Sequence, residues 1–333
     1  MDKAPGDDYL GRFREIVSDP LNLLIERDVD AGLVRKGVVR LHNGHIVSVN
    51  GEAGYYGDFS NILAINRGVH EPLEEYVFQE LLKVLPAAPM MVELGAYWGH
   101  YSMWLKQARP EGRVWLVEPS LSNLRVGQLN FKRNGYKGRF INALVAPGQF
   151  EIDPFMAEHG LGHLHVLHSD IQGAELAMLT GAEQTFRNRT VDYAVISTHG
   201  QALHFEVIEK LRDYSYRIEV TSDFVYESTG HDGLVFASSP EVAPVFEGFQ
   251  PMGREQICQS VSEQLIEYVG RRGRVRPSVA DVPVVETAEV GPLASVAVAG
   301  QKLVKLFARL CAVVLDRNGR DVPALKVKGL KDV

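Results

Sequence analysis

Four ionisable residues, Glu93, Glu118, Asp170 and His199, each stand at the end of a short apolar run in this 333-residue sequence. Apolar runs of this length, separated by amphipathic stretches, are typical of buried parallel strands that alternate with helices. In an open parallel sheet the carboxyl ends of the strands meet at one edge, and ligands bind there. We therefore expect these four side chains to share one site.

A glycine loop follows the first of these strands, in the sequence MMVELGAYWGHY. Dinucleotide-binding loops use GxGxxG, whereas Gly95 and Gly99 are spaced GxxxG, and the bulky Tyr97 and Trp98 between them would crowd a pyrophosphate. The ExGxxxG form suits S-adenosylmethionine (SAM), which carries an ammonium, a carboxylate and a sulfonium but no phosphate. The alternative is a glycine turn of an unrelated α/β protein. The expected SAM-binding residues of this segment are Glu93, Gly95, Ala96, Tyr97 and Gly99.

Two further strand ends are placed to hold the nucleoside part of such a ligand. Glu118 ends the second strand, where an acidic side chain can accept both ribose hydroxyls. This arrangement serves NAD as well as SAM, and a solvated acid is the alternative interpretation. Asn142 and Ala143 end the third strand and are expected to flank the adenine.

Asp170 and His199 are the candidates for the transfer chemistry. Asp170 follows the fourth strand on the same side as His168, and it would face the amino-acid end of SAM, a substrate hydroxyl or a metal ion. His199 follows the fifth strand, and a neutral imidazole there could take a proton from a hydroxyl as its oxygen attacks the methyl group. Such an in-line displacement needs alignment and proton removal. A histidine hydrogen-bonded into its loop is the alternative for His199.

A divalent metal ion is compatible with the pattern but is not required by it. Asp170, His199 and the pair His231-Asp232 could converge as ligands of Mg²⁺ or a similar ion. A second group, in which four histidines stand close together in the sequence, also resembles a metal site: His159, His163, His165 and His168. Only His163 and His165 share a strand face, however, and no cysteine accompanies the group. We assign no metal ligand from the sequence.

Seven short strands are expected between residues 90 and 237, and most of them alternate with helices. The last two have no clear helix between them, which indicates a closing antiparallel pair. The sequence therefore predicts an α/β fold with a doubly wound, mainly parallel seven-stranded sheet, the Rossmann-like arrangement of class I SAM-dependent methyltransferases. The expected strands cover residues 90–92, 113–117, 139–143, 164–168, 191–197, 216–221 and 234–237, and one helix is expected over 173–186.

Three regions are expected along the chain. Residues 1–65 form an N-terminal lead-in or cap segment with a hairpin around Asn43-Gly44, 66–240 form the methyltransferase domain, and 241–333 form a C-terminal extension. The extension contains a linker over 271–292 and an amphipathic helix over about 293–315. This helix could dock on the domain, on a second subunit or on a membrane surface.

Bulk composition argues against several classes of protein. A net charge of −7 disfavours a nucleic-acid binder, two cysteines are too few for a disulfide framework, and no apolar run approaches the ~20 residues of a membrane-spanning helix. The amino terminus lacks the basic start and apolar run of a signal peptide. We expect a cytoplasmic protein with a small-molecule or glycan acceptor, and with self-association or docking through the C-terminal helix.

Several segments between residues 66 and 238 carry a family pattern: RGVHEPLEE, VELGAYWGHYS, LVEPS, DIQGAELAMLTGAE, STHGQALH with RIEV behind it, and DGLVFAS. Together they resemble the FkbM-type SAM-dependent methyltransferases. The resemblance implies O-methylation of a carbohydrate or natural product. It also implies a role near the transfer site for Asp170, and SAM binding by Glu93, Gly95, Gly99 and Glu118.

The resemblance leaves part of the site and two other activities open. It identifies no catalytic base, so the role of His199 follows from its position alone, and Gln172 stands where many relatives carry an acid. A nucleotide-dependent oxidoreductase is disfavoured by the glycine spacing. A non-catalytic SAM-binding or scaffold protein would keep the fold and dock through its C-terminal helix.

Overall fold

The computed structural model describes residues 9–49, 54–55 and 57–272. These residues belong to one compact unit that extends to residue 275, and a second unit comprises residues 276–333. The amphipathic helix expected at 293–315 and nearly all of the expected linker lie outside the described residues. The division at residues 65 and 240 stays a prediction.

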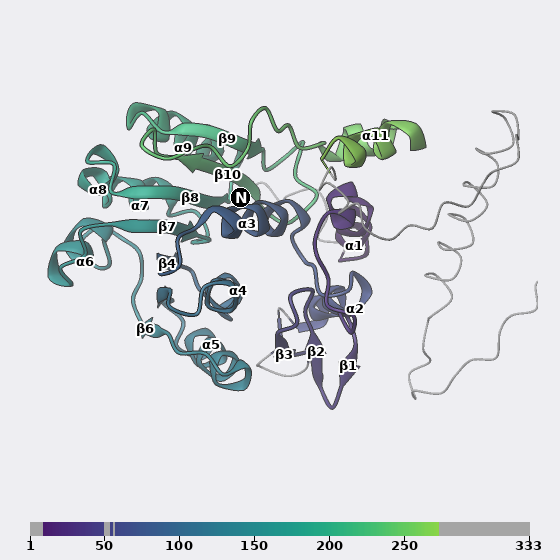
Figure 1. Ribbon diagram of the computed structural model, residues 1–333, viewed down its shortest axis with the longest axis horizontal. Coiled ribbons are helices and arrows are strands. Elements are labelled where there is room, and N and C mark those ends of the chain that lie inside the picture. Colours follow the sequence, from purple (N-terminus) through teal and green to yellow (C-terminus); the bar gives the residue numbers. More distant parts are fainter. Residues whose placement is uncertain (1–8, 50–53, 56, 273–333) are drawn as a thin grey trace, which may run out of the picture. The chain divides into compact units, whose positions relative to one another are not determined.

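A seven-stranded sheet forms the centre of the described unit, with the strand order β6-β5-β4-β7-β8-β10-β9 (Figure 1). Neighbours from β6 to β8 run parallel, whereas β10 is antiparallel to both β8 and β9. The strands are β4 Met90–Leu94, β5 Arg113–Val117, β6 Arg139–Ile141, β7 Leu164–Ser169, β8 Val191–Thr198, β9 Arg217–Ser222 and β10 Gly233–Ser238. The predicted fold, including the closing antiparallel pair, is confirmed.

Alternate residues of the strands enter two separate cores, because successive side chains of a strand point to opposite faces of the sheet. In β4, Met91 belongs to one core, while Met90 and Val92 belong to the other. Helices α3 Pro72–Val84, α4 His100–Ala108 and α5 Leu121–Asn134 contribute to the first core. The second core is completed by α6 Ile152–Glu158, α7 Glu175–Thr180, α8 Glu183–Arg187 and α9 Gln201–Asp213.

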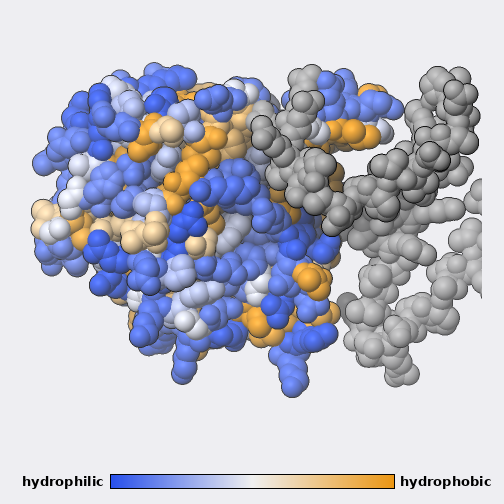
Figure 2. All heavy atoms as spheres, viewed as in Figure 1, coloured by the Kyte–Doolittle hydropathy of each residue, from blue (hydrophilic) through white to orange (hydrophobic). Residues whose placement is uncertain are grey.

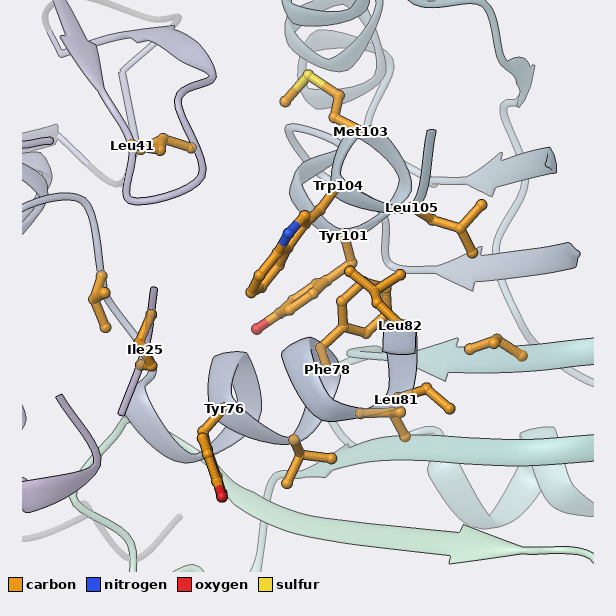
Figure 3. Close-up of a cluster of buried hydrophobic side chains, with 14 of the residues drawn as sticks. Ile25, Leu41, Tyr76, Phe78, Leu81, Leu82, Tyr101, Met103, Trp104 and Leu105 are labelled. Atoms are coloured by element: carbon orange, nitrogen blue, oxygen red, sulfur yellow. The ribbon is translucent and has the colours of Figure 1, made fainter. Parts of the chain in front are cut away.

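Helices α3 and α4 pack against each other through large buried side chains (Figure 3). The rings of Phe78 in α3 and Tyr101 in α4 have centroids 5.0 Å apart, and Phe78 also lies 5.6 Å from Trp104. Burial of each such side chain contributes roughly 1.5–3 kcal/mol of transfer free energy. This contact fixes the helix that follows the glycine loop.

The N-terminal segment packs on the same core. It contains α1 Tyr9–Ser18, η1 Pro20–Leu23, β1 Val34–Arg35, β2 Val38–Arg40, β3 Ile46–Ser48, η3 Gly57–Ser60 and α2 Asn61–Ile65. The predicted hairpin is confirmed, since β2 and β3 pair in antiparallel register around Asn43-Gly44. Leu41 and Ile62 of this segment are fully buried in the core of α3 and α4.

The structure differs from the sequence analysis at several elements, among them the following. The helix expected over 173–186 is broken into α7 and α8, because Asp153 of α6 accepts hydrogen bonds from the N–H groups of Gln184 (2.8 Å) and Thr185 (2.9 Å) and so caps a new helix start. Two helices that the sequence did not predict, α10 Arg254–Gln259 and α11 Ser262–Arg272, follow the sheet.

The surface is mostly hydrophilic on the face drawn in Figure 2, with apolar residues in small groups. Exposed apolar side chains such as Leu23, Val29 and Ile266 come from different elements. Among the described residues, no helix has both the length and the apolar character needed to cross a membrane.

Candidate functional site

The glycine loop between β4 and α4 lies directly against the end of β7. Gly95 has a φ of +70°, and a Cβ atom there would lie 1.6 Å from the backbone oxygen of Asp170. Gly99 has a φ of +75°, and its Cβ would lie 2.9 Å from the ring of Phe131. Both positions therefore require glycine, for backbone conformation and for space. The loop and Asp170 form one continuous surface at the carboxyl edge of the sheet.

Glu93 lies inside the fold beside this loop, with 3% of its surface exposed. Its carboxylate accepts a hydrogen bond from the backbone N–H of Ser102 at 3.0 Å, in the first turn of α4. Burial raises the pKa of Glu93, while the contacts with His168 and Ser102 act in the opposite direction. The side chain thus satisfies N–H groups at the start of α4, where negative charge is favourable.

Glu118 connects the glycine loop to the turn after β5. Its carboxylate accepts hydrogen bonds from the N–H groups of Tyr97 (3.1 Å) and Ser120 (2.9 Å) and from the side-chain amide of Asn123 (3.3 Å). Asn142 donates from its side-chain amide to the backbone oxygen of Glu118 at 2.9 Å, and the half-buried Ala143 follows it. The predicted nucleoside residues are therefore neighbours.

Asp170 and His199 come together with two further carboxylates. The Nε2 atom of His199 lies 3.1 Å from Asp170 Oδ1 and 3.3 Å from Asp232 Oδ1, and its Nδ1 lies 2.6 Å from Glu175 Oε1. Glu175 is fully buried, whereas 32% of the Asp170 side chain is exposed. Asp170 is therefore the member of this cluster that a bound molecule reaches most easily.

The surrounding carboxylates determine the charge of His199. Burial alone would lower its pKa, but hydrogen bonds with Asp170, Asp232 and Glu175 outweigh burial and raise the pKa of His199 to about 12. Burial would raise the pKa of Asp170, but the hydrogen bond from His199 lowers it, while burial raises the pKa of Asp232. In this structure His199 is an imidazolium at neutral pH, which differs from the neutral imidazole expected from the sequence.

The start of helix α3 brings two acids to the site that the sequence analysis did not assign to it. Glu74 lies 2.7 Å from His168 Nε2 and accepts a hydrogen bond from the Ser197 hydroxyl at 2.7 Å. Glu71 has a strongly raised pKa, caused first by burial and then by its acidic neighbours. A signal was present, because Glu74 lies four residues before Phe78 and therefore on the buried stripe of α3.

Three groups of side chains in the described residues could hold a metal ion, each with ligand atoms within 4.8 Å of one another. One is Asp170, His199 and Asp232, which the sequence analysis had weighed. The others are His163, His165 and Asp192 at the start of β7 and β8, and His42, Glu75 and His100 in the interior. The four histidines His159, His163, His165 and His168 do not form one group.

The residues at the carboxyl edge fit the chemistry of SAM. Glu118 accepts three hydrogen bonds and a carboxylate offers about four acceptor positions, so one position on Oε2 is still open to a ribose hydroxyl. The negative charge of Asp170 and its acidic neighbours suits the positive sulfonium and ammonium groups of SAM. These features belong to adjacent strand ends, as the location of ligands in such sheets requires.

Residues 123–218 match the protein family described as Methyltransferase FkbM domain. The match confirms the FkbM-type resemblance. It runs from α5 into β9 and includes Asn142, Asp170 and His199, whereas the glycine loop and Glu118 precede it. Together with the strand order, the FkbM match supports a SAM-dependent methyltransferase.

Similar solved structures include several methyltransferases. Precorrin-6y C5,15-methyltransferase from Geobacter metallireducens GS-15 is 15% identical over 49% of this chain and 85% of that chain, with a TM-score of 0.38. TrmK of M. capricolum, in complex with S-adenosyl-homocysteine (SAH), is 10% identical over 71% and 96%, with a TM-score of 0.35. Ribosomal protein L11 methylase from Lactobacillus delbrueckii subsp. bulgaricus is 13% identical over 50% and 79%, with a TM-score of 0.36. No curated protein matches the chain.

Proposed function

We propose that this protein transfers the methyl group of SAM to a hydroxyl oxygen of a carbohydrate or another small hydroxylated molecule. The observation that carries the proposal is the contact between the glycine loop and Asp170, where a Cβ at Gly95 would overlap the Asp170 backbone. Because the loop is expected to hold SAM, the exposed Asp170 carboxylate lies where an acceptor would approach it.

The chain supplies positioning and a place for the proton. SAM brings a methyl group on a positive sulfur, from which it can be displaced in line. As the oxygen–carbon bond forms, the positive charge moves to the attacking oxygen and is removed when the hydroxyl proton leaves. Asp170 is the proposed acceptor of that proton, and the imidazolium of His199 holds its carboxylate in place. Glu118 is proposed to hold a ribose hydroxyl, and Asn142 and Ala143 to flank the adenine.

A transfer assay tests this function. Purified protein is incubated with methyl-labelled SAM and a panel of sugars and small alcohols, and the labelled product is characterised by NMR. A methyl ether as the product supports the proposal. Transfer only to nitrogen or carbon would overturn the proposed oxygen specificity and leave methyl transfer itself standing.

A divalent ion at Asp170, His199 and Asp232 is the competing arrangement at the same place. Such an ion would displace the His199 proton and acidify a bound hydroxyl. Activity that survives exhaustive chelation supports the metal-free proton transfer proposed above. The opposite result is loss of activity on chelation, with recovery on addition of Mg²⁺ in wild type but not in Asp232→Asn. That result would replace the metal-free proton transfer with a metal-dependent one.

A further inference from the structure

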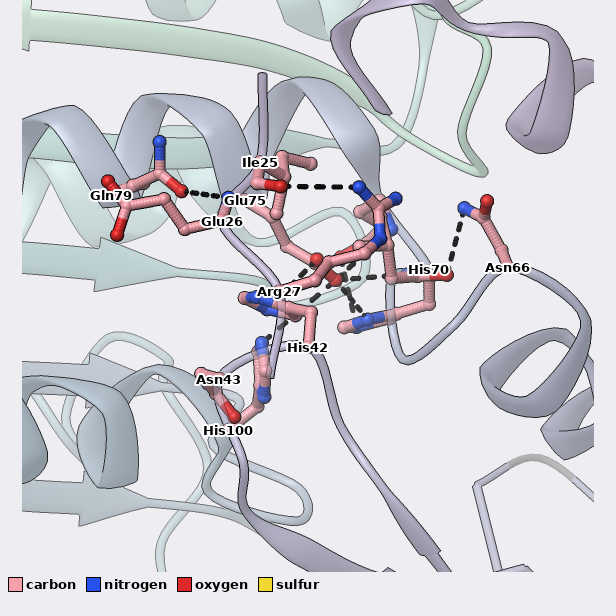
Figure 4. A network of polar contacts seen from close by, with 12 residues as sticks. Ile25, Glu26, Arg27, His42, Asn43, Asn66, His70, Glu75, Gln79 and His100 are labelled. Atoms are coloured by element: carbon pink, nitrogen blue, oxygen red, sulfur yellow. Dashed lines mark hydrogen bonds and ion pairs between the residues drawn. The ribbon is translucent and has the colours of Figure 1, made fainter. Parts of the chain in front are cut away.

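A group of buried histidines lies apart from the candidate transfer site, between the N-terminal segment and the first helices of the sheet domain. His42 comes from the loop between β2 and β3, His70 precedes α3, and His100 begins α4. These histidines lie around the carboxylate of Glu75 in α3 (Figure 4). None of the four side chains is more than 2% exposed.

The distances show convergence on one carboxylate. His42 Nε2 lies 3.1 Å from Glu75 Oε2, His70 Nδ1 lies 2.5 Å from Glu75 Oε1, and His100 Nε2 lies 4.0 Å from Glu75 Oε1. Backbone N–H donation from His70 at 3.0 Å satisfies Glu75 Oε1. These residues come from three elements far apart in the chain, so the tertiary fold creates the group.

Several of these buried atoms have no hydrogen bond of acceptable geometry. They are Glu75 Oε2, His70 Nδ1 and both ring nitrogens of His42 and of His100. Buried polar atoms are almost always partnered, and an unpartnered one requires an explanation such as an ion. A buried carboxylate oxygen that faces imidazole nitrogens without hydrogen bonds has the arrangement of ligands around a shared cation.

We propose that Glu75, His42 and His100 bind one divalent transition-metal ion, with Zn²⁺ as the best match. The three ligand atoms lie within 4.8 Å of one another. Tetrahedral zinc, with bonds of about 2.0–2.2 Å to nitrogen and oxygen, places its ligand atoms roughly 3.3–3.5 Å apart, so small side-chain shifts close the site. Two imidazoles with one carboxylate favour zinc over magnesium or calcium, which prefer oxygen ligands.

A surface cavity and the guanidinium of Arg27 lie next to this histidine group. The cavity, of about 430 Å³, is lined in part by His42 and Trp104, so it adjoins the buried group. The nearby Arg27 directs its guanidinium N–H groups to the backbone of Asn22 and Ile25 rather than to Glu75. The Oε2 atom of Glu75 is therefore free to coordinate.

The ion would join three parts of the fold. His42 belongs to the N-terminal segment, Glu75 to α3 and His100 to α4, and His100 directly follows Gly99 of the glycine loop. With all ligands buried, the site has a structural role and holds the end of the loop in place. This inference does not depend on the acceptor or on methyl transfer.

Zinc titration of the full chain tests the proposal. Protein freed of metal by chelation is titrated with Zn²⁺, and one equivalent is expected to bind and to raise the melting temperature. His42→Gln and His100→Gln should each weaken zinc binding by about tenfold or more. His45→Gln is the matched control, because His45 is 2% exposed in the same loop and its Nε2 contacts the Tyr136 hydroxyl at 3.1 Å instead. Zinc affinity should be unchanged in that control.

Other outcomes separate this site from the remaining two groups. Folded wild-type protein that binds no zinc overturns the proposal, as does unchanged affinity in both His42→Gln and His100→Gln. Loss of zinc binding in His163→Gln or Asp232→Asn alone also overturns it, because these residues belong to the other groups. If His42→Gln and His100→Gln do not fold, X-ray absorption of zinc-loaded His163→Gln shows how many imidazoles bind the ion. At least two imidazoles on zinc support the site, and one or none contradicts it.

Discussion

His199 Nε2 donates a hydrogen bond to Asp170 Oδ1 over 3.1 Å, which joins the ends of β7 and β8. Because Asp232 and Glu175 also contact the imidazole, His199 keeps its proton, and Asp170 keeps a negative charge. The unprotonated, solvent-accessible base of this site at neutral pH is therefore the carboxylate of Asp170 and not the imidazole of His199. This relationship moves the proposed proton transfer from His199 to Asp170.

The charge state of His199 is directly measurable. Since its pKa is about 12, the ring nitrogens should keep imidazolium chemical shifts from pH 6 to pH 9 in ¹⁵N NMR. His199→Gln identifies the signal by its disappearance. A titration midpoint near the ordinary value of about 6.5 would contradict the assigned ion pairs.

The same pKa shift predicts how stability depends on pH. A folded-state pKa above the unfolded value of about 6.5 means that folding favours the protonated imidazole. The stabilisation from His199 is therefore fully present below about pH 6.5 and is lost as the pH rises toward 12. Between pH 7 and 9, the unfolding free energy of wild type should fall more steeply than that of His199→Gln in urea titrations. Parallel curves would show that His199 does not gain a proton on folding.

Proton removal by Asp170 predicts a specific kinetic defect. Asp170→Asn should reduce the turnover of methyl transfer by about 10²–10⁴-fold, a far larger factor than the accompanying loss of affinity for SAH. The matched variant is Asp192→Asn, an acid at the opposite end of the parallel strands, in β8, which should keep full activity. An Asp170→Asn enzyme with wild-type turnover excludes this role.

The contact at Gly95 predicts a large difference between two glycine substitutions. Gly95→Ala places a methyl group against the Asp170 backbone, whereas Gly148 has a similar φ of +72° and nothing within 4 Å of its Cβ position. Both variants lose the conformational freedom of glycine, so their difference reports the collision alone. We expect Gly95→Ala to lower the unfolding free energy by about 3 kcal/mol more than Gly148→Ala in chemical denaturation. Equal effects would place the loop away from β7.

The buried pair between Glu74 and His168 predicts a stability effect from an acid in α3. Glu74→Ala leaves the His168 ring and the Ser197 hydroxyl without a partner. The expected loss in unfolding free energy is about 3–5 kcal/mol. Glu183→Ala, which removes a solvent-exposed partner of Arg187, serves as control and should have little effect. A small loss for Glu74→Ala would mean that the pair contributes little to the fold.

Local patterns in the sequence predicted most of the sheet and placed Asp170 and His199 at neighbouring strand ends. They could not predict the charge of His199, because Glu175 and Asp232 reach it from other elements. Glu74 and His168 are separated by 94 positions, so their pairing depends on how α3 crosses the sheet. The break between α7 and α8 likewise follows from a cap supplied by Asp153 of α6. In each case a long-range contact of a charged side chain changed a locally reasonable interpretation.

Calorimetric titration of the folded wild-type protein with SAH tests the central claim most directly. We predict one binding site per chain, and an affinity at least about tenfold lower in Glu118→Gln, since that carboxylate is proposed to hold a ribose hydroxyl. Near-UV circular dichroism verifies that each protein is folded. Saturable binding at one site would agree with a SAM-dependent methyltransferase. Absence of SAH and SAM binding in well-folded wild-type protein would contradict it.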